Sequence, residues 1–355
     1  MSSRDEGAST VRLTASPLTL RFRRTFAISR GGRDQARNVL AVIERDGVVG
    51  IGEGAPNLYY DGQTQETALA GMAEMEGHLA ADPYAAEVIG EALARAFPAQ
   101  SGARAAVDIA LHDWIGRRLG VPVASLFGLP TGLRMSTSYT ISLGSREDVV
   151  DAVEQAEGWP LLKLKLGGDD DLGLAEAALN ASSAIVRVDA NAAWTVDEAI
   201  EKGRALSGMG VELIEQPIPP GDPDGLRRVS GAVDAPIVAD EDCRTSRDVQ
   251  RLAGCVDGVN IKLAKTGGIR EALNTALVAR ALGLNVMLGT MAESSIGTAA
   301  MAQLIPLARW VDLDGPLLLR PEDDLAKGLR YEDGQILMPE GPGIGVTLRE
   351  GRPVG

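Results

Sequence analysis

The first third of the chain changes from a strand-like to a helix-like hydrophobic pattern. Residues 10–55 favour strands, and the segment NVLAVIERDGVVGIGEGAP has two apolar runs on either side of Asp46-Gly47, which predicts a hairpin. Residues 64–120 favour three helices, the last of which ends near Gly120. Strands followed by helices predict an α+β arrangement for this part of the chain.

From about residue 134 onward, short apolar runs alternate with stretches suited to helices. Eight of these runs predict strands: STSYTISL, LLKLKL, AIVRVDA, VELIEQP, PIVADED, DGVNIKL, NVMLGT and RWVDLD. Eight strands with intervening helices over about 180 residues predict a parallel β/α barrel. A doubly wound open sheet is the alternative, but it usually has fewer strands and a Gly-rich first turn.

The chain is long enough for two domains. Its 355 residues suit about two units of roughly 150 residues. The expected division is an α+β capping domain of residues 1–125 plus 320–355, and a barrel domain of residues 126–319. Glycines recur within residues 50–54, but they lack the following helix of a nucleotide-binding loop, so a β-turn is expected there.

Charge and composition narrow the expected partners. Lys and Arg number 35 against 49 Asp and Glu, a formal charge of −14, so neither nucleic acid nor a membrane surface is an expected partner. No apolar run is long enough to cross a bilayer, and the N-terminus MSSRDEGAST lacks an apolar signal core. With only two cysteines, these features predict a cytoplasmic protein without disulfides.

Charged residues recur at the ends of the predicted barrel strands, in runs that are otherwise apolar. They are Lys163, Lys165, Asp189, Glu215, Asp240 and Lys262. From Lys165 onward they are separated by 24, 26, 25 and 22 residues, about one β/α unit each. The carboxyl ends of barrel strands meet at one rim, where barrel enzymes build their sites. The spacing therefore predicts a single cluster in space.

The residue types in this cluster indicate metal-assisted proton chemistry. Three carboxylates from neighbouring strands, without His or Cys, form a set that suits Mg²⁺. We expect the metal and neighbouring amines to depress a lysine pKa, and the metal to stabilise charge when a proton leaves a carbon beside a carboxylate. A single acid at a strand end is more often a helix cap or a surface ion pair, but repetition over four units favours function.

Several segments resemble the enolase superfamily, muconate-lactonising subgroup. The similar segments are LLKLKL, DANAAW, EQP, ADED and NIKLAKTGG, preceded by DIALHDWIGRRLG, and the likeness spans nearly the whole chain. The resemblance implies an α/β fold, a modified (β/α)7β TIM barrel with an α+β capping domain. It implies Mg²⁺ as the cofactor, with three carboxylate ligands: Asp189, Glu215 and Asp240.

The resemblance also implies roles for the lysines. Lys165 and Lys262 look like acid/base residues on opposite faces of the substrate, and Lys163 looks like the electrostatic neighbour of Lys165. Lys265 is expected to face solvent or to act as a helper. Asp242 departs from the family pattern, because relatives often have Ser at this position. Its extra charge is expected to leave the metal ligand Asp240 unaffected.

Two further regions bear on the substrate. In WVDLDGPLLL, Asp312 and Asp314 resemble the Asp-x-Asp with which dipeptide epimerases bind a free N-terminus; a turn or cap is the alternative. The segment FAISRGGRDQAR also resembles these epimerases, which implies that Arg30 meets the distal acid of a C-terminal glutamate; an exposed loop arginine is the alternative. The expected substrate lining also includes Thr140 and Ala292, with a lid formed by Tyr59-Tyr60.

The expected function is Mg²⁺-dependent epimerisation of dipeptides of the L-Ala-D/L-Glu type. One lysine would remove the α-proton of the C-terminal residue to give an enediolate, and the other would return a proton from the opposite face. The family likeness suggests murein-peptide recycling and a homo-oligomer. The alternatives are a lyase or cycloisomerase, of the o-succinylbenzoate synthase or muconate cycloisomerase type, and a non-catalytic binding protein.

Overall fold

The computed structural model describes residues 11–79 and 82–350. Its first part is an antiparallel sheet with β2 in the middle, formed by β1 (Arg12–Ile28), β2 (Gly31–Arg45) and β3 (Val48–Gly54). The turn between β2 and β3 is at Asp46-Gly47, and both residues have positive φ, 51° and 72°. This is the backbone that a two-residue hairpin turn requires, so the predicted hairpin is confirmed.

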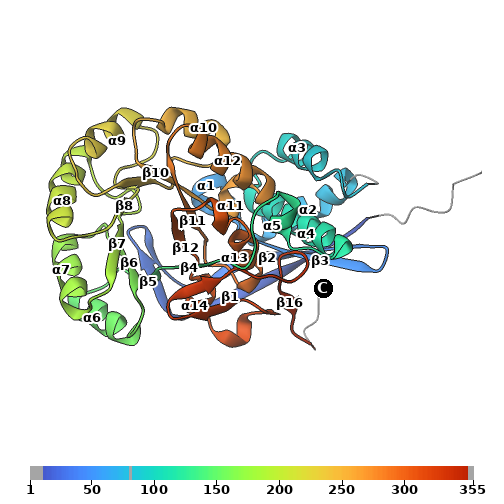
Figure 1. Cartoon of the computed structure of the whole chain (residues 1–355), viewed down its shortest axis with the longest axis horizontal. Coiled ribbons are helices and arrows are strands. Elements are labelled where there is room, and N and C mark those ends of the chain that lie inside the picture. Colours follow the sequence, from blue (N-terminus) through green and yellow to red (C-terminus); the bar gives the residue numbers. More distant parts are fainter. Residues whose placement is uncertain (1–10, 80–81, 351–355) are drawn as a thin grey trace, which may run out of the picture.

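Helices cover one face of this sheet (Figure 1). They are α2 (Gln65–Met75) and α4 (Ser101–Leu119); α3 (Ala86–Ala96) and α5 (Val123–Leu126) pack on α4, and α1 (Leu58–Asp61) precedes α2. The glycines of β3 allow α4 to approach closely, because a Cβ added at Gly52 would lie 2.1 Å from the Ala106 carbonyl oxygen. The expected β-turn at residues 50–54 is therefore wrong: these residues form a strand pressed against a helix.

Eight parallel strands form the second part, a nearly closed barrel (Figure 1). In chain order they are β5 (Tyr139–Ile141), β6 (Leu161–Lys165), β7 (Ile185–Asp189), β8 (Ile214–Glu215), β9 (Ile237–Ala239), β10 (Gly258–Ile261), β11 (Asn285–Gly289) and β12 (Trp310–Asp312). Each strand pairs with the next, and buried Val, Ile and Leu side chains fill the space between strands and helices. The predicted fold is confirmed.

A helix follows each barrel strand. The helices are α6 (Arg146–Gln155), α7 (Asp171–Ala181), α8 (Val196–Gly208), α9 (Pro223–Ser230), α10 (Ser246–Leu252), α11 (Leu263–Thr266), α12 (Ile269–Ala281), α13 (Ser295–Ala302) and α14 (Gly315–Leu318). Ser145 and Thr195 form capping boxes at α6 and α8, which start these helices directly after the preceding strand and loop. Strand ends are thereby held at the same rim of the barrel.

The C-terminal tail contacts both parts. It contains β13 (Ala326–Lys327), β14 (Arg330–Glu332), β15 (Gln335–Leu337) and β16 (Thr347–Leu348), and β15 pairs with β4 (Arg134–Ser136). Arg117 of α4 donates to the Val346 carbonyl oxygen over 2.6 Å, which ties the tail to the first part. The exact domain boundaries stay a prediction.

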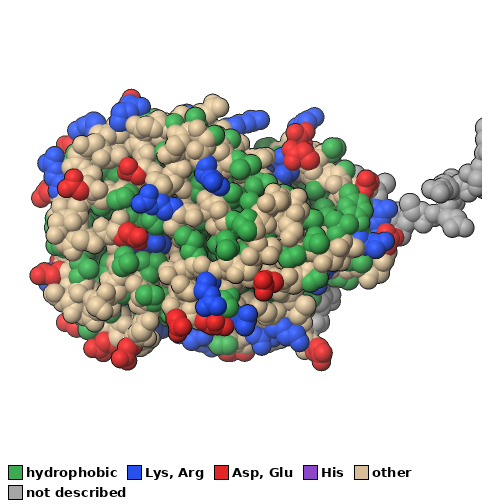
Figure 2. Space-filling model, in the orientation of Figure 1, with side chains coloured by type: hydrophobic (Ala, Val, Ile, Leu, Met, Phe, Trp, Pro, Cys, Tyr) green, Lys and Arg blue, Asp and Glu red, His purple; other side chains and the backbone are tan. Residues whose placement is uncertain are grey.

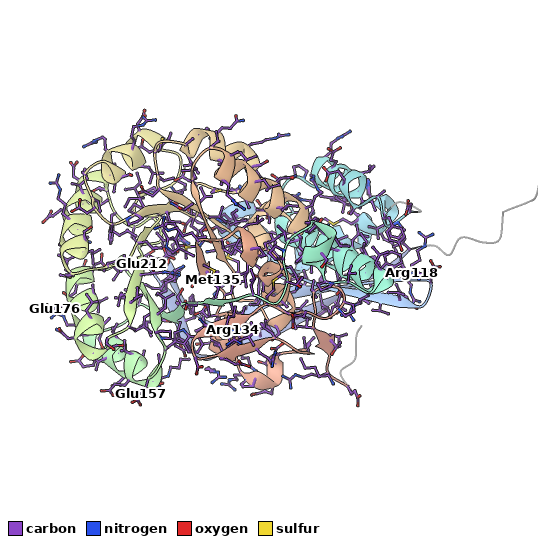
Figure 3. The ribbon with its side chains drawn as sticks, viewed as in Figure 1. Arg118, Arg134, Met135, Glu157, Glu176 and Glu212 are labelled. Atoms are coloured by element: carbon purple, nitrogen blue, oxygen red, sulfur yellow. The ribbon has the colours of Figure 1, made fainter. Side chains whose placement is uncertain are left out.

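Charged side chains of both signs are spread over the surface. Figure 2 shows acidic and basic side chains interspersed over the face in view. Figure 3 shows Glu157 and Glu176 on the outer side of the barrel, where both are exposed. Within the described ranges, no helix has both the length and the apolarity needed to cross a bilayer.

Candidate active site

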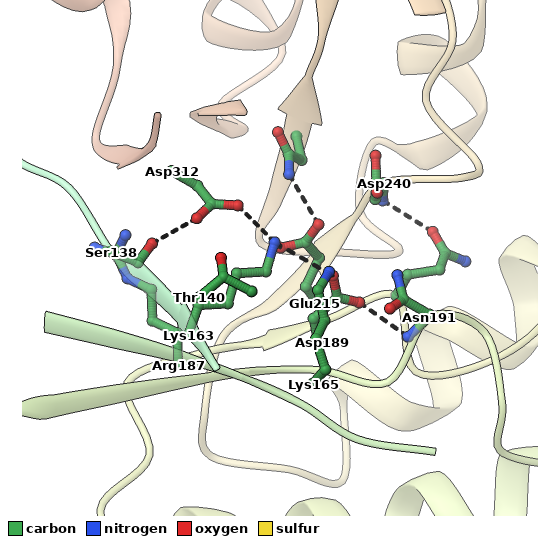
Figure 4. Close-up of polar contacts among 12 residues, drawn as sticks. Ser138, Thr140, Lys163, Lys165, Arg187, Asp189, Asn191, Glu215, Asp240 and Asp312 are labelled. Carbon is green, nitrogen blue, oxygen red and sulfur yellow. Dashed lines mark hydrogen bonds and ion pairs between the residues drawn. The ribbon is translucent and has the colours of Figure 1, made fainter. Parts of the chain in front are cut away.

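The charged residues that recur along the sequence meet at one rim of the barrel (Figure 4). Lys163 and Lys165 lie on β6, and Asp189 and Glu215 end β7 and β8. Asp240 and Lys262 directly follow β9 and β10, and all six side chains are buried. A cavity of about 90 Å³ opens at this rim, lined also by Phe26, Ile28 and Tyr60 from the first part of the chain. The predicted convergence is therefore present.

Lys163 lies at the centre of a buried charge network. Its Nζ lies 2.6 Å from Asp312 Oδ2, 2.7 Å from Glu215 Oε2 and 3.2 Å from Asp189 Oδ2. Lys165 Nζ lies 2.6 Å from the same Asp189 oxygen. Burial alone would lower the pKa of Lys163, but these carboxylates outweigh burial and raise it well above its usual value. Lys163 is therefore a fixed positive charge.

Lys262 and Lys265 both contact Asp240. Lys262 Nζ lies 2.8 Å from Asp240 Oδ2, and Lys265 donates to Asp240 Oδ1 and, over 2.8 Å, to the Asn260 carbonyl oxygen. Lys265 is fully buried, so the expectation that it faces solvent is wrong. Burial would lower the pKa of Lys262, but the charge of Asp240 outweighs burial and raises it. The expected depression of a lysine pKa therefore does not hold for Lys262 while it is paired with Asp240.

The surroundings shift the pKa values of the three carboxylates in different directions. Burial, followed by repulsion from Asp189, raises the pKa of Glu215 to about 7. Burial also opposes ionisation of Asp189, yet Lys165 and Lys163 hold the pKa of Asp189 well below its usual value. Lys262 and Lys265 do the same for Asp240 against its burial. Crowded, buried carboxylates of this kind are stabilised by a further cation.

The donor set suits Mg²⁺, but its oxygens face lysines in this arrangement. No group of three or more His, Cys, Asp or Glu side chains in residues 11–79 and 82–350 is positioned to hold a metal ion as it stands. Asn191 contributes a buried Oδ1 without a hydrogen-bond partner, and its backbone N–H donates to Asp189 Oδ1 over 2.9 Å. Oxygen donors suited to a hard cation therefore lie close together at this rim, but the carboxylates are not arranged around a common point.

Asp312 and Asp314 lie at the end of the site nearest β5. Asp312 accepts from Lys163 and, over 2.7 Å, from Ser138 Oγ, while Asp314 accepts from the Thr140 backbone N–H over 2.6 Å. Burial, followed by repulsion from Asp312, raises the pKa of Asp314 to about 7. Asp314 is the N-cap residue of α14, as the turn-or-cap alternative expects, but its side chain makes no capping bond and faces Thr140 instead.

Arg30 comes from the turn between β1 and β2 and reaches the barrel rim. Its Nη1 lies 3.0 Å from Glu241 Oε1 and 2.9 Å from the Asn191 carbonyl oxygen, and its guanidinium stacks 4.3 Å from the Tyr59 ring centre. Arg30 is exposed and lies in a turn, as the loop-arginine alternative expects, but its guanidinium is already bound to protein. Glu241 and Asn191 were not singled out from the sequence, although each neighbours a predicted ligand in the ADED and DAN runs.

The remaining predicted residues support the rim. Ala292 lines the cavity, and its carbonyl oxygen accepts from Asn38 Nδ2 over 2.8 Å. Asp242 accepts from Gln216 Nε2 over 2.7 Å, and Gln216 Oε1 accepts from the Asp240 backbone N–H over 2.9 Å. Asp242 thus helps to orient the loop that carries Asp240, through Gln216.

Comparison with known proteins identifies the class of this enzyme. Residues 147–352 match the enolase C-terminal domain-like family, and residues 9–128 match the N-terminal domain of the mandelate racemase / muconate lactonizing enzyme family. The chain belongs to this family of the enolase superfamily, so the predicted resemblance is confirmed.

Individual proteins of the family are similar to this chain over most of its length. The chain is 33% identical to an L-Ala-D/L-amino acid epimerase of Maribacter sp., over 96% of this chain and 100% of that protein. It is 36% identical to muconate cycloisomerase 1-2 of Acinetobacter lwoffii, over 85% and 83%. A dipeptide epimerase of Cytophaga hutchinsonii, solved with Mg and the dipeptide D-Ala-L-Val, superposes with a TM-score of 0.90 at 28% identity, over 96% of each chain. The prediction of an enzyme, an isomerase of this family, is confirmed.

Proposed function

We propose that this protein epimerises dipeptides at the α-carbon of the C-terminal residue. The observation that carries the proposal is the arrangement of two amines, Lys165 and Lys262, on separate strands around one set of carboxylates, with Asp312 and Asp314 at the far end. Acid/base groups on two sides of one carbon suit proton removal from one face and return to the other. A buried pair of carboxylates suits a substrate ammonium.

In this proposal Asp189, Glu215 and Asp240 hold Mg²⁺. When bound, Mg²⁺ supplies positive charge against the negative charge that develops on the substrate carboxylate. Lys163 remains protonated and supplies a fixed charge beside Lys165, because its amine contacts three carboxylates. One catalytic lysine accepts the α-proton as a neutral amine, and the protonated partner donates a proton to the opposite face.

The proposed substrate is a dipeptide of the L-Ala-D/L-Glu type, with murein-peptide recycling in the cytoplasm as the role. Thr140 and Ala292 line the cavity, and Arg30 lies above the rim. Because Arg30 is bound to Glu241, a substrate glutamate has to compete with that carboxylate for the guanidinium. The alternative is a cycloisomerase or o-succinylbenzoate synthase, whose substrate has no ammonium for Asp312 and Asp314 to bind.

Exchange of the α-proton in D₂O, followed by NMR with each epimer in turn, tests the two lysines. Wild type is expected to incorporate deuterium into both epimers. Lys165→Ala and Lys262→Ala are expected to lose epimerisation, and each to keep exchange with at most one epimer, the opposite one for each variant. Exposed Lys327→Ala is the control and is expected to behave as wild type. Epimerisation by either active-site variant removes that lysine from the proposal.

Metal binding and the ammonium site need separate experiments. Calorimetric titration with MgCl₂ is expected to give one site that Asp240→Asn weakens at least tenfold, and chelation is expected to abolish turnover. Asp314→Asn is expected to raise KM for a dipeptide more than tenfold, because it removes a buried charge facing the ammonium. Unchanged dipeptide affinity in Asp314→Asn favours the cycloisomerase alternative.

A further inference from the structure

A second cavity, of about 660 Å³, lies between the two parts of the chain and away from the lysines of the active site. Its walls come from α3 and α4 on one side and from α10, α11 and α12 on the other (Figure 1). Four of these elements each contribute one arginine, so we call it the arginine cavity: Arg95, Arg104, Arg247 and Arg270. Its volume is within the range of small-molecule sites.

Arg104 is the least satisfied of these arginines. It is largely buried, its Nε has no hydrogen-bond partner, and its guanidinium lies against Gly267, where an added Cβ would come within 2.7 Å of Nη1. Among the described residues, no carboxylate lies within ion-pair distance of Arg104. Burial lowers the pKa of Arg104. Asp61, Asp108 and Glu271 favour the charged form of Arg104 without forming an ion pair with it. The guanidinium can therefore take a closer oxyanion partner from outside the chain.

Two of the carboxylates that line the cavity are hydrogen-bonded to backbone N–H groups. Asp108 Oδ2 accepts from the Ile269 backbone N–H over 2.5 Å, and Glu271 Oε1 accepts from the Ser246 N–H over 2.9 Å. Both therefore cap helices of the barrel, and their charges act on Arg104 without a direct ion pair. Exposed Glu91 also lines the cavity. Glu87 pairs with Arg270 at 2.7 Å.

Two further arginines leave donors free at the mouth. Arg95 and Arg247 are exposed, and their side chains make no hydrogen bond or ion pair to any residue in the described ranges. Together with Arg104 they present guanidinium groups from three helices to one space. Guanidinium groups match the paired oxygens of phosphate and carboxylate, which they bind in bidentate fashion.

We propose that the arginine cavity binds a small oxyanion, a phosphate or dicarboxylate compound, at the junction of the first part and the barrel. Arg104 forms its floor, and Arg95 and Arg247 close over it from opposite sides. The oxyanion then bridges α3 and α4 to α10, so its binding stabilises the junction. The site is separate from the proposed catalytic one, and it does not depend on the reaction.

The test is binding of inorganic phosphate and of succinate to the full-length protein, by calorimetry and by thermal unfolding. NaCl of equal ionic strength controls for general screening of surface charge. Wild type is expected to bind at least one of the two anions saturably, with a rise in Tm beyond that in NaCl. If only one of the two anions binds, that result shows whether the cavity accepts phosphate or dicarboxylate compounds.

Variants locate the binding. Arg104→Met keeps the length of the side chain, removes its charge, and is expected to weaken binding at least tenfold. Arg280→Met on α12 is the matched control, because Arg280 is exposed and outside the cavity, and is expected to bind as wild type. If Arg104→Met does not fold, exposed Arg247→Met replaces it, with a several-fold loss expected.

The proposal is overturned by three results. The first is no saturable binding of either anion beyond the NaCl effect. The second is equal binding by wild type and by the folded cavity variant. The third is a combination of two observations: wild type binds neither anion, and the cavity variant has a changed oligomeric mass. That combination would identify this face as a contact between copies of the chain.

Discussion

Lys265 shows how one buried amine organises the rim. It donates to Asp240 Oδ1, to the Asp240 carbonyl oxygen over 2.6 Å and to the Asn260 carbonyl oxygen over 2.8 Å. Lys265→Met leaves those acceptors buried and Asp240 less compensated, so we expect a loss of about 3–5 kcal/mol in the free energy of unfolding. Urea denaturation measures it, with exposed Lys327→Met as control. A loss below about 1 kcal/mol would contradict this account of Lys265.

Glu293 predicts how stability depends on pH. Burial, followed by repulsion from Glu53, raises the pKa of Glu293 from 4.5 to about 8. Between these values the folded chain keeps a proton that the unfolded chain has released, so this group makes stability fall as pH rises from about 5 to 8. Glu293→Gln cannot release that proton. Its stability relative to wild type is expected to increase over that range in denaturation curves, and parallel pH profiles would refute the prediction.

At the residue scale, the sequence predicted the groups that lie at strand ends and missed those brought in by tertiary contact. Lys165, Asp189 and Glu215 end apolar runs, so strand geometry alone brings them to one rim. The bond between Arg30 and Glu241 joins residues 211 positions apart, and no local pattern indicates it. The burial of Lys265 was missed because it depends on how α11 turns after β10.

Among the elements, β3 and α4 are packed backbone against backbone. A Cβ at Gly52 would lie 2.1 Å from the Ala106 carbonyl oxygen, which is backbone and has little room to move. We expect Gly52→Ala to destabilise the protein by at least about 1–3 kcal/mol, the cost of overpacking. Gly77→Ala is the control, because nothing lies within 4 Å of its added Cβ. Equal unfolding midpoints in urea would show that the strand and helix separate freely.

The same contact explains an error at the element scale. Glycines at alternate positions were interpreted as a turn, because glycine tolerates turn conformations. In a strand, alternate residues share one face, and three small residues on that face leave room for a helix backbone. Gly50, Gly52 and Gly54 are such a set, since each would collide with the backbone of α4 if it carried a Cβ. The eight barrel strands were easier to predict because buried parallel strands are continuous apolar runs.

At the scale of the whole molecule, buried polar groups join the two parts. Glu53 at the end of β3 accepts from the Ser294 and Gly297 backbone N–H groups at the start of α13, over 3.0 and 3.1 Å. Asn38 Nδ2 bonds both Glu53 Oε1 and the Ala292 carbonyl oxygen, over 2.7 and 2.8 Å. The first part of the chain therefore supports the loop after β11, which lines the active-site cavity, and the two parts are expected to act together.

Arg30 provides the test of that coupling on the open side of the active site. Its guanidinium is bound to Glu241 and Asn191 of the barrel, so removing it frees the β1–β2 turn above the cavity. We expect Arg30→Ala to raise KM several-fold for dipeptides ending in either glutamate or an apolar residue, with a smaller effect on kcat. Arg33→Ala is the control, because Arg33 lines the same cavity and its guanidinium lies over the rings of Phe22 and Phe26, without an ion pair to any described residue. A rise confined to glutamate dipeptides would instead mean that Arg30 leaves Glu241 to bind the substrate acid.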